Sequence, residues 1–258
     1  MIDHISIMMV QPEIIWEKVE QNLKMLDSML ADKLENIDLL VLPETFSTGF
    51  TMRADHFAED EKGLTLSWMK ELARKNDLCV TGSLIFRDGA RISNRLYWIT
   101  PDGIDGYYDK RHLFRMGRED QYYTPGDSRV IMNLKDFRLM PQICYDLRFP
   151  VFARNQNDYD ILFYVANWPA PRHLVWETLL RARAIENLAY VIGVSRSGKD
   201  GEGVDHLGGS CVVDPIGRIE HILGPEPGVL HFGIELKKIR EFREKFPAWK
   251  DADKFKLL

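Results

Sequence analysis

Short, unbroken apolar runs recur along this 258-residue chain and alternate with stretches of helical periodicity. A strand that is covered on both faces has no polar side, so its sequence is a continuous apolar run rather than an alternating pattern. The predicted strands are residues 5–10, 37–42, 78–84, 91–100, 136–143, 160–166, 189–195, 209–213 and 229–234. We therefore expect a largely buried β-sheet core, with a turn at Asp88-Gly89 between two of these strands.

Helical periodicity separates the apolar runs. The predicted helices are residues 13–34, 66–75, 174–187 and 236–246. Pro12 suits the first turn of a helix, where its missing N–H costs little, and Pro247 is expected to end the last one. Strands that alternate with helices predict an α/β fold with the helices outside. No linker divides the chain, so we expect one domain over residues 1–258, with residues 236–258 as a C-terminal helix and tail.

Charge and composition argue against several classes of protein. The chain has 34 Lys and Arg residues against 39 Asp and Glu, a formal net charge of −5, which does not suit nucleic acid as the main partner. No apolar stretch approaches the roughly 20 residues of a membrane-spanning helix, and no signal-peptide pattern is present. Three scattered cysteines without a C-x-x-C pair suit a reducing compartment. We therefore expect a cytoplasmic protein that binds neither nucleic acid nor a membrane.

The motifs of several common catalytic sites are missing. The sequence has no G-x-G-x-x-G turn, no P-loop and no G-x-S-x-G nucleophile elbow, which argues against dinucleotide binding, phosphate cradling and serine hydrolysis. The seven histidines show no metal-ligand spacing. We expect neither a metal nor another cofactor.

Two polar residues stand where predicted buried strands end. Glu44 follows residues 37–42, and Cys144 follows residues 136–143. Ligands collect at the carboxyl ends of strands in open α/β sheets, and Lys110 lies between these two residues in the chain. Position alone assigns no role, because a glutamate after a strand is often solvated or caps a helix, a lone lysine is often a surface charge, and a cysteine is often a small buried hydrophobe.

A cysteine, a carboxylate and an ammonium group nevertheless make a coherent catalytic set. The thiolate is the nucleophile, and a nearby lysine favours it over the thiol, whose pKa is roughly 8.5 when free. A carboxylate can take the thiol proton and deliver it to a leaving group. The same ammonium, with a backbone N–H beside the cysteine, can stabilise a developing oxyanion.

Three segments, in this order, resemble the motifs of the nitrilase superfamily of carbon–nitrogen hydrolases. They are P-E at residues 43–44, D-K-R-H-L-F at 109–114 and C-Y-D-L-R-F-P at 144–150, and the likeness extends from about residue 5 to about residue 233. The resemblance implies a four-layer α-β-β-α sandwich, a Glu44–Lys110–Cys144 triad, and a homodimer or larger homo-oligomer. Glu119 resembles the second glutamate of this family, which implies that it holds Lys110 and orients the substrate; the plain alternative is a solvated loop residue.

The finer resemblance is to the omega-amidase branch, through residues 144–150, A-N-W-P-A-P-R at 166–172 and R-A-R-A-I-E-N at 181–187. It implies hydrolysis of a small-molecule amide, 2-oxoglutaramate or 2-oxosuccinamate, to the 2-oxo acid and ammonia through a thioester on Cys144. Glu44 would act as base and acid, and Lys110 with the backbone N–H of Tyr145 would hold the oxyanion.

The carboxylate of such a substrate needs a cation, and arginine binds carboxylates through paired hydrogen bonds. Arg148 is the first candidate, since some related carbamoylases use this position, and its alternative role is an ion pair with an acidic neighbour. Arg172 is the second candidate. Phe50, Tyr145 and Trp168 are candidates for the apolar walls, although each could simply pack in the core.

Two kinds of alternative stay open at this point. An aliphatic amidase, an N-carbamoyl hydrolase or a nitrilase would share the same catalytic set, because specificity lies in the shape and charge of the pocket. A catalytically silent binding protein would be a different class, and the intact set of Glu44, Lys110, Glu119 and Cys144 argues against it.

Overall fold

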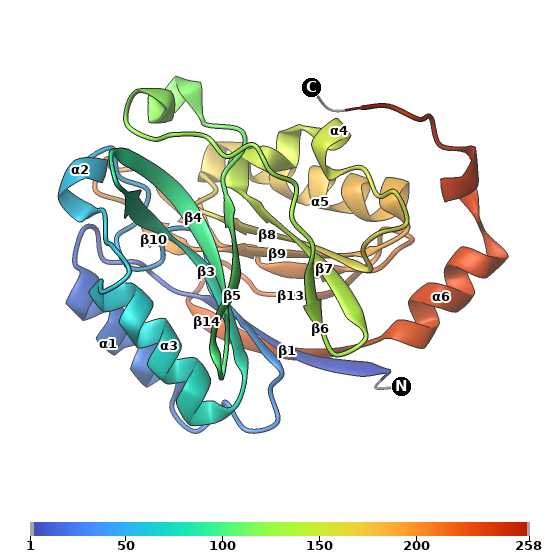
Figure 1. The fold of residues 1–258 in the computed structure, drawn as a ribbon, viewed down its shortest axis with the longest axis horizontal. Coiled ribbons are helices and arrows are strands. Elements are labelled where there is room, and N and C mark those ends of the chain that lie inside the picture. Colours follow the sequence, from blue (N-terminus) through green and yellow to red (C-terminus); the bar gives the residue numbers. More distant parts are fainter. Residues whose placement is uncertain (1–2, 257–258) are drawn as a thin grey trace.

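The computed structural model describes residues 3–256, which form two six-stranded β-sheets packed face to face (Figure 1). The first sheet has the order β14 (Gly228–Glu235), β1 (His4–Gln11), β2 (Leu39–Val41), β3 (Cys79–Asp88), β4 (Arg91–Thr100) and β5 (Gly103–Asp109). Strands β1, β2 and β3 pair in parallel, and the other neighbours pair antiparallel. The parallel centre brings the carboxyl ends of these strands to one edge of the sheet.

The second sheet repeats this plan. Its order is β13 (Ile219–Ile222), β12 (Cys211–Val213), β9 (Tyr190–Ser195), β8 (Ile161–Ala166), β7 (Phe137–Ile143) and β6 (Met132–Leu134). Strands β7, β8 and β9 are parallel, and the outer pairs are antiparallel. A short hairpin of β10 (Ser197–Lys199) and β11 (Asp205–Leu207) follows β9.

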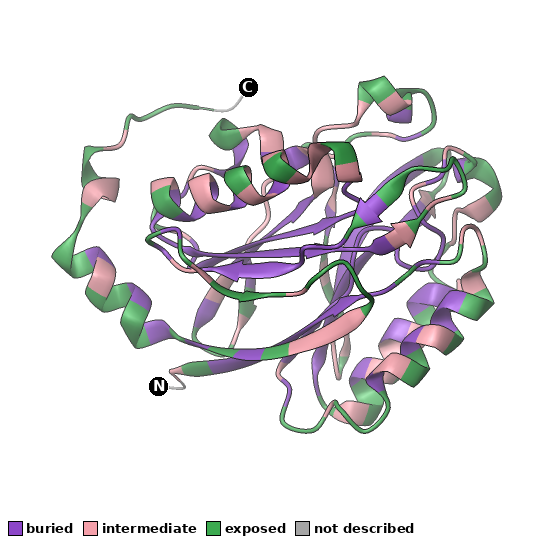
Figure 2. Cartoon of the chain, turned by 180° about the vertical axis from the view of Figure 1, so that it is seen from behind, coloured by how far each residue is buried: buried purple, intermediate pink, exposed green. Residues whose placement is uncertain are grey.

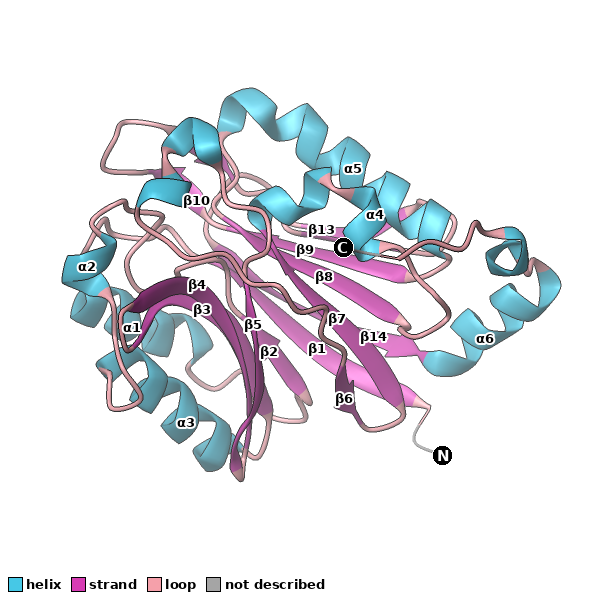
Figure 3. Cartoon of the chain, turned by 45° about the horizontal axis from the view of Figure 1, so that its top comes forward, coloured by secondary structure: helices cyan, strands magenta, loops and turns pink. Residues whose placement is uncertain are grey.

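Helices cover the outer faces of both sheets (Figure 3). Helices α1 (Val19–Leu30) and α3 (Leu64–Asn76) pack on the first sheet, and α4 (Pro150–Ala153) and α5 (His173–Asn187) lie over the second. The short α2 (Ala54–Phe57) precedes α3, and α6 (Leu236–Lys245) continues from β14 away from the sandwich. The expected four-layer α-β-β-α sandwich is confirmed. Within residues 3–256, no helix has the length and apolar character needed to cross a membrane.

The side chains of β1 show why the apolar runs are unbroken. Ile5, Ile7 and Met9 point into the core between the sheets, whereas Met8 and Val10 point into the core beneath α1 and α3. Successive residues of a strand face opposite sides, so a strand with a core on each side needs apolar residues throughout. Figure 2 shows both sheets as a buried interior between partly exposed helices.

The first helix begins later than its periodicity predicts. It starts at Val19, not at residue 13, because Asn22 pins the preceding loop: its side chain donates to the Ile15 carbonyl at 2.7 Å and accepts from the Ile15 N–H at 2.8 Å. The apolar spacing of Ile15 is coincidental, since its side chain lies in this loop and is 42% exposed. Pro12 therefore does not open a helix. The other predicted helices and the Asp88-Gly89 turn are confirmed, and α6 ends before Pro247.

The sequence pattern did not predict five of the strands: β5, β6, β10, β11 and β13. Most are short or lie at the edge of a sheet, where one side of the strand faces solvent and no apolar run is required. The predicted runs are thus the central strands and one edge strand, β14, whereas sequence periodicity did not find the other edge strands.

Arg243 is the polar anchor of α6 and generates a stability prediction. Its buried guanidinium donates to the carbonyls of Leu188 and Tyr159 at 2.9 and 2.8 Å and to Asp160 Oδ1 at 3.1 Å. Arg243→Leu should lower the free energy of unfolding by about 2–3 kcal/mol in urea titrations, because buried partners of a charged donor are left unpaired. Exposed Lys237→Leu on the same helix is the control. A loss for Arg243→Leu no larger than that of the control would contradict this account.

Candidate active site

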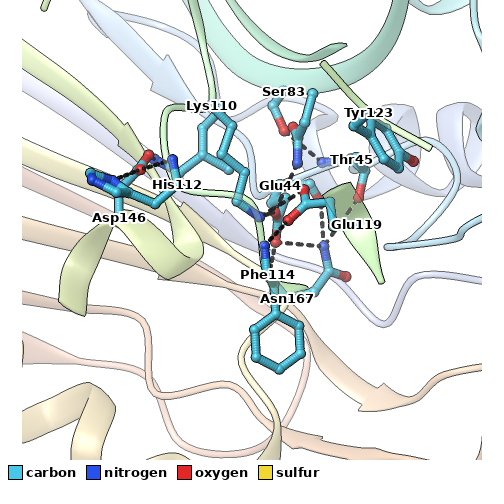
Figure 4. A network of polar contacts seen from close by, with 12 residues as sticks. Glu44, Thr45, Ser83, Lys110, His112, Phe114, Glu119, Tyr123, Asp146 and Asn167 are labelled. Carbon is cyan, nitrogen blue, oxygen red and sulfur yellow. Dashed lines mark hydrogen bonds and ion pairs between the residues drawn. The ribbon is translucent and has the colours of Figure 1, made fainter. Parts of the chain in front are cut away.

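Three strand ends converge at the junction of the two sheets and carry the predicted triad. Glu44 follows β2 and Lys110 follows β5, both in the first sheet, whereas Cys144 follows β7 in the second. The Glu44 and Lys110 side chains are 0% and 1% exposed, and the charge of the neighbouring Glu44 contributes to raising the pKa of the Cys144 thiol. Glu119 joins them from the loop after Lys110 (Figure 4). The structure therefore brings together all four residues that the sequence singles out.

Lys110 is the centre of the cluster. Its Nζ lies 2.9 Å from Glu44 Oε1 and 3.0 Å from Glu119 Oε1. Burial favours the neutral amine, but the charges of Glu119 and Glu44 outweigh it and raise the pKa of Lys110 well above its ordinary value. Lys110 is therefore an ammonium ion whose third N–H is not used by either carboxylate.

Glu119 has no sign of the solvated loop position that was its plain alternative. Its side chain is fully buried; Oε1 accepts from Lys110, and Oε2 accepts from the Phe114 N–H at 2.6 Å. Burial raises the pKa of this carboxyl although Lys110 opposes the shift. Both oxygens accept hydrogen bonds, which is the pattern of a carboxylate rather than a carboxylic acid.

Cys144 opens the turn after β7 in a left-handed backbone conformation, with φ of 45°. A non-glycine residue pays for such a conformation, and residues held this way cluster at active sites. Burial raises the pKa of the thiol well above its usual range, and the charges of Glu44 and Glu119 outweigh the opposing charge of Lys110. The resting cysteine is therefore a neutral thiol, and its attack requires a base.

Two asparagines that the sequence reasoning did not select also bind Glu44. Asn94 Nδ2 on β4 donates to Glu44 Oε1 at 2.9 Å, and the Asn167 N–H after β8 donates to Glu44 Oε2 at 2.8 Å. Each comes from a distant part of the chain and has no spacing motif around it. The A-N-W-P-A-P-R segment was the one available signal, and it marked a branch resemblance without assigning Asn167 a role.

Asp146 links the lysine segment to the cysteine turn. Its fully buried carboxylate accepts from the His112 N–H and Nδ1 at 2.9 and 2.7 Å, from the Tyr108 hydroxyl at 2.8 Å and from the Ile143 N–H at 2.9 Å. Figure 4 shows the contact between Asp146 and His112 beside the Lys110 cluster. Because Tyr108 and His112 flank Lys110, and Ile143 precedes Cys144, this carboxylate sets the spacing between cation and nucleophile.

A cavity of about 380 Å³ opens onto this cluster. Lys110, Cys144 and Asn167 lie at its floor, and its volume is in the range of small-molecule sites. All five predicted substrate residues line it: Phe50, Tyr145, Arg148, Trp168 and Arg172. The sequence missed the lining residues Trp16 and Phe114, which come from loops, and His206 on the short strand β11.

The two pocket arginines are without carboxylate partners in the described part of the chain. The Arg148 guanidinium lies 5.7 Å from the Trp168 ring centroid, and that of Arg172 lies 5.2 Å from the Phe114 ring centroid. Among residues 3–256, neither forms an ion pair, so the alternative role of Arg148 as half of a structural ion pair is wrong there. In the same range, no three His, Cys, Asp or Glu side chains are grouped as a metal site requires.

The sequence profile of the Carbon-nitrogen hydrolase family matches residues 7–244. The chain belongs to this family. It is similar to omega-amidase YafV of Escherichia coli, with 42% identity and 98% of each chain covered. It is also similar to 2-oxoglutaramate amidase of Bacillus subtilis, with 32% identity over 96% of this chain and 98% of the relative. Among solved structures, XC1258 of Xanthomonas campestris is a CN-hydrolase superfamily protein with an arsenic adduct in its active site. It superposes with a TM-score of 0.96 at 40% identity, covering 99% of both chains.

The charge of the cluster yields a prediction for this carbon–nitrogen hydrolase. Glu119→Gln removes one of the negative charges that raise the pKa of the Cys144 thiol, so the thiolate should form at lower pH. Since one pKa unit is a tenfold change in thiolate fraction, iodoacetamide should label Cys144 about three- to tenfold faster at pH 7. Amide hydrolysis should fall by at least about tenfold, because Lys110 loses one of its two anchors.

Peptide mapping and a charge-matched variant control this experiment. Cys79 and Cys211 should stay unlabelled, since both are buried and neither lines the cavity through which iodoacetamide reaches Cys144. Exposed Glu35→Gln should change neither rate. Inactivation with label on Cys79 or Cys211 alone would exclude Cys144 as the nucleophile, and an unchanged alkylation rate in Glu119→Gln would exclude the electrostatic role of Glu119.

Proposed function

We propose that this enzyme is an omega-amidase, which hydrolyses the terminal amide of a 2-oxo dicarboxylic acid monoamide, such as 2-oxoglutaramate or 2-oxosuccinamate, to the 2-oxo acid and ammonia. The similarity to omega-amidase YafV and to 2-oxoglutaramate amidase over nearly the full length supports this. The observation that carries the proposal is the pairing, in one cavity, of the Cys144 cluster with the unpaired guanidinium groups of Arg148 and Arg172.

The carboxylate of the substrate binds at the arginines. A guanidinium that lies against an aromatic ring, without an ion pair to a carboxylate, is held in place and keeps its donors for a ligand. Arg148 over Trp168 and Arg172 over Phe114 have this arrangement. Phe50, Tyr145 and Trp168 supply apolar wall for the methylene carbons of the substrate.

The reacting amide lies over Cys144. Glu44 accepts the thiol proton as sulfur forms a bond to the amide carbon, and the carbonyl π pair moves onto oxygen. The oxyanion binds the third N–H of Lys110 and the backbone N–H of Tyr145. As the carbonyl re-forms, the C–N bond breaks and Glu44 gives its proton to the departing nitrogen, which leaves ammonia and a thioester on Cys144.

Hydrolysis of the thioester returns the enzyme to its first state. Glu44 takes a proton from water as the water oxygen attacks the thioester carbon, and sulfur leaves to regain that proton. Glu119 contributes by holding Lys110 and the Phe114 N–H, and therefore by fixing where the oxyanion can bind. Each group returns to its starting protonation state, so no cofactor is needed for balance.

We also propose an oligomeric state and a location for this enzyme. The resemblance to the superfamily supports a homodimer or larger homo-oligomer. The sparse cysteines, of which Cys79, Cys144 and Cys211 are all free thiols, support a cytoplasmic location.

Ammonia release from 2-oxoglutaramate is the direct test of the function. We expect turnover of this amide to exceed that of a panel of aliphatic amides, N-carbamoyl compounds and nitriles. Cys144→Ala should lower it by at least about 1,000-fold, because the step that forms the thioester is lost. Preference for another member of the panel would keep the Cys144 chemistry and reject the omega-amidase assignment, while activity that survives in Cys144→Ala would reject the nucleophile.

Arginine variants test the carboxylate site. Arg148→Met and Arg172→Met should each raise KM for 2-oxoglutaramate by about 10- to 100-fold, because a hydrogen bond to a charged group contributes roughly 1.5–3 kcal/mol. KM for a neutral amide should change by less than about twofold, since it makes no such bond. Exposed Arg115→Met, outside the cavity lining, is the control. Equal rises for both amides would show that the arginines shape the pocket rather than bind the carboxylate.

A further inference from the structure

We propose that Asn167 is a positioning residue that fixes the general base Glu44 relative to the nucleophile Cys144. Asn167 follows β8 directly, is 6% exposed, and lies at the floor of the cavity. Its role goes beyond the triad and Glu119, and it concerns the geometry of proton transfer rather than the identity of the substrate.

Asn167 holds Glu44 by both its main chain and its side chain. The Asn167 N–H donates to Glu44 Oε2 at 2.8 Å, and Nδ2 donates to the Glu44 carbonyl at 2.7 Å and to Thr45 Oγ1 at 3.2 Å. A backbone carbonyl only accepts hydrogen bonds, so the NH₂ end of the amide must face Glu44. Figure 4 shows Asn167 below Glu44, with its nitrogen turned toward the base. Asn167 thus donates hydrogen bonds to both the carboxylate and the backbone carbonyl of Glu44.

These contacts cross from one sheet to the other. Glu44 follows β2, and its other side-chain donors, Asn94 on β4 and Lys110 after β5, also belong to the first sheet. Asn167 belongs to the second sheet, where β8 pairs in parallel with β7 and places Val165 opposite Ile143, the residue before Cys144. Among the side chains that donate hydrogen bonds to Glu44 in the described part of the chain, Asn167 is the one that ties the base to the sheet that carries the nucleophile.

The turn that carries Glu44 depends on such outside support. Thr45 is β-branched and fully buried, yet it has a left-handed φ of 42°. Such a conformation persists only where the surroundings hold it. Ser83 Oγ accepts from the Thr45 N–H at 2.9 Å, and the Asn167 amide donates to Thr45 Oγ1. Without the Asn167 side chain, the turn is free to relax toward an unstrained backbone, and the Glu44 carboxylate moves with it.

Misplacing Glu44 affects some reactions more than others. Glu44 must take the proton of Cys144 and also deliver a proton to the departing nitrogen, because an unprotonated amide ion is too poor a leaving group. An activated ester releases p-nitrophenolate without a proton, so its acylation step needs only the first of these transfers. A displacement of about 1 Å can cost roughly 100-fold when geometry is critical. The loss should therefore be larger for an amide than for a p-nitrophenyl ester.

Two variants of Asn167 test the proposal. Asn167→Ala removes the side-chain bonds, and Asn167→Asp keeps the shape but places an acceptor oxygen against the Glu44 carbonyl. Both should lower kcat for the amide by about 30- to 100-fold, with KM within about threefold. The p-nitrophenyl ester burst should slow by less than about fivefold. The amide is whichever primary amide the wild-type enzyme hydrolyses fastest, so a wrong substrate assignment leaves this test intact.

Asn155→Ala is the matched control. Asn155 is likewise buried and donates from its side-chain amide to two backbone carbonyls, of Tyr159 and Asn187, at 3.0 Å each, away from the cavity. It should lower the melting temperature comparably and leave the amide-to-ester ratio unchanged. Amide turnover within about twofold of wild type in Asn167→Ala, or equal losses for amide and ester, would overturn the proposal. If Asn167→Ala does not fold, the near-isosteric Asn167→Asp tests the proposal through the same comparison of its loss of amide turnover with its loss of ester turnover.

Discussion

Lys110 carries its positive charge in a place where both of its neighbours are carboxylates and almost no surface is exposed. Removing these charges from water costs free energy. The attraction between Lys110 and the two carboxylates offsets that cost only while Glu44 and Glu119 stay within hydrogen-bonding distance. The three come from separate segments, so the ends of β2 and β5 and the loop beyond must converge. The lining of the cavity beside Cys144 and the protonation of its thiol both depend on this ion cluster.

The central strands could be predicted because they have a core on each side. That condition leaves an apolar run in the sequence, as in β1 and β8, and helices that cover one face leave a helical period. Edge strands such as β5 and β13 meet neither condition, so periodicity could not find them. The predicted start of the first helix at residue 13 was wrong for another reason. Ile15 has the spacing of a helical residue, but a hydrogen bond from Asn22, seven residues along the chain, holds it in a loop.

The reacting groups of the site could be predicted, and their supports could not. Glu44, Lys110, Glu119 and Cys144 have distinctive chemistry and lie in motif-like segments, so resemblance found them. Asn94 and Asn167 meet Glu44 from 50 and 123 residues away in sequence, and a lone asparagine has no periodic signature. Arg148 shows the same limit, because its freedom from an acidic partner is a property of the folded surroundings rather than of its neighbours in the chain.

The neutral thiol of Cys144 also affects how the enzyme withstands oxidants. Peroxides oxidise thiolates far faster than thiols, so a cysteine that keeps its proton is a slow target for conversion to sulfenic acid. Glu44 removes that proton only as a carbonyl carbon comes within bonding distance of sulfur. Burial and the charges of Glu44 and Glu119, which delay ionisation against the opposing charge of Lys110, therefore act as a chemical safeguard: they slow the oxidation of the sulfur between turnovers.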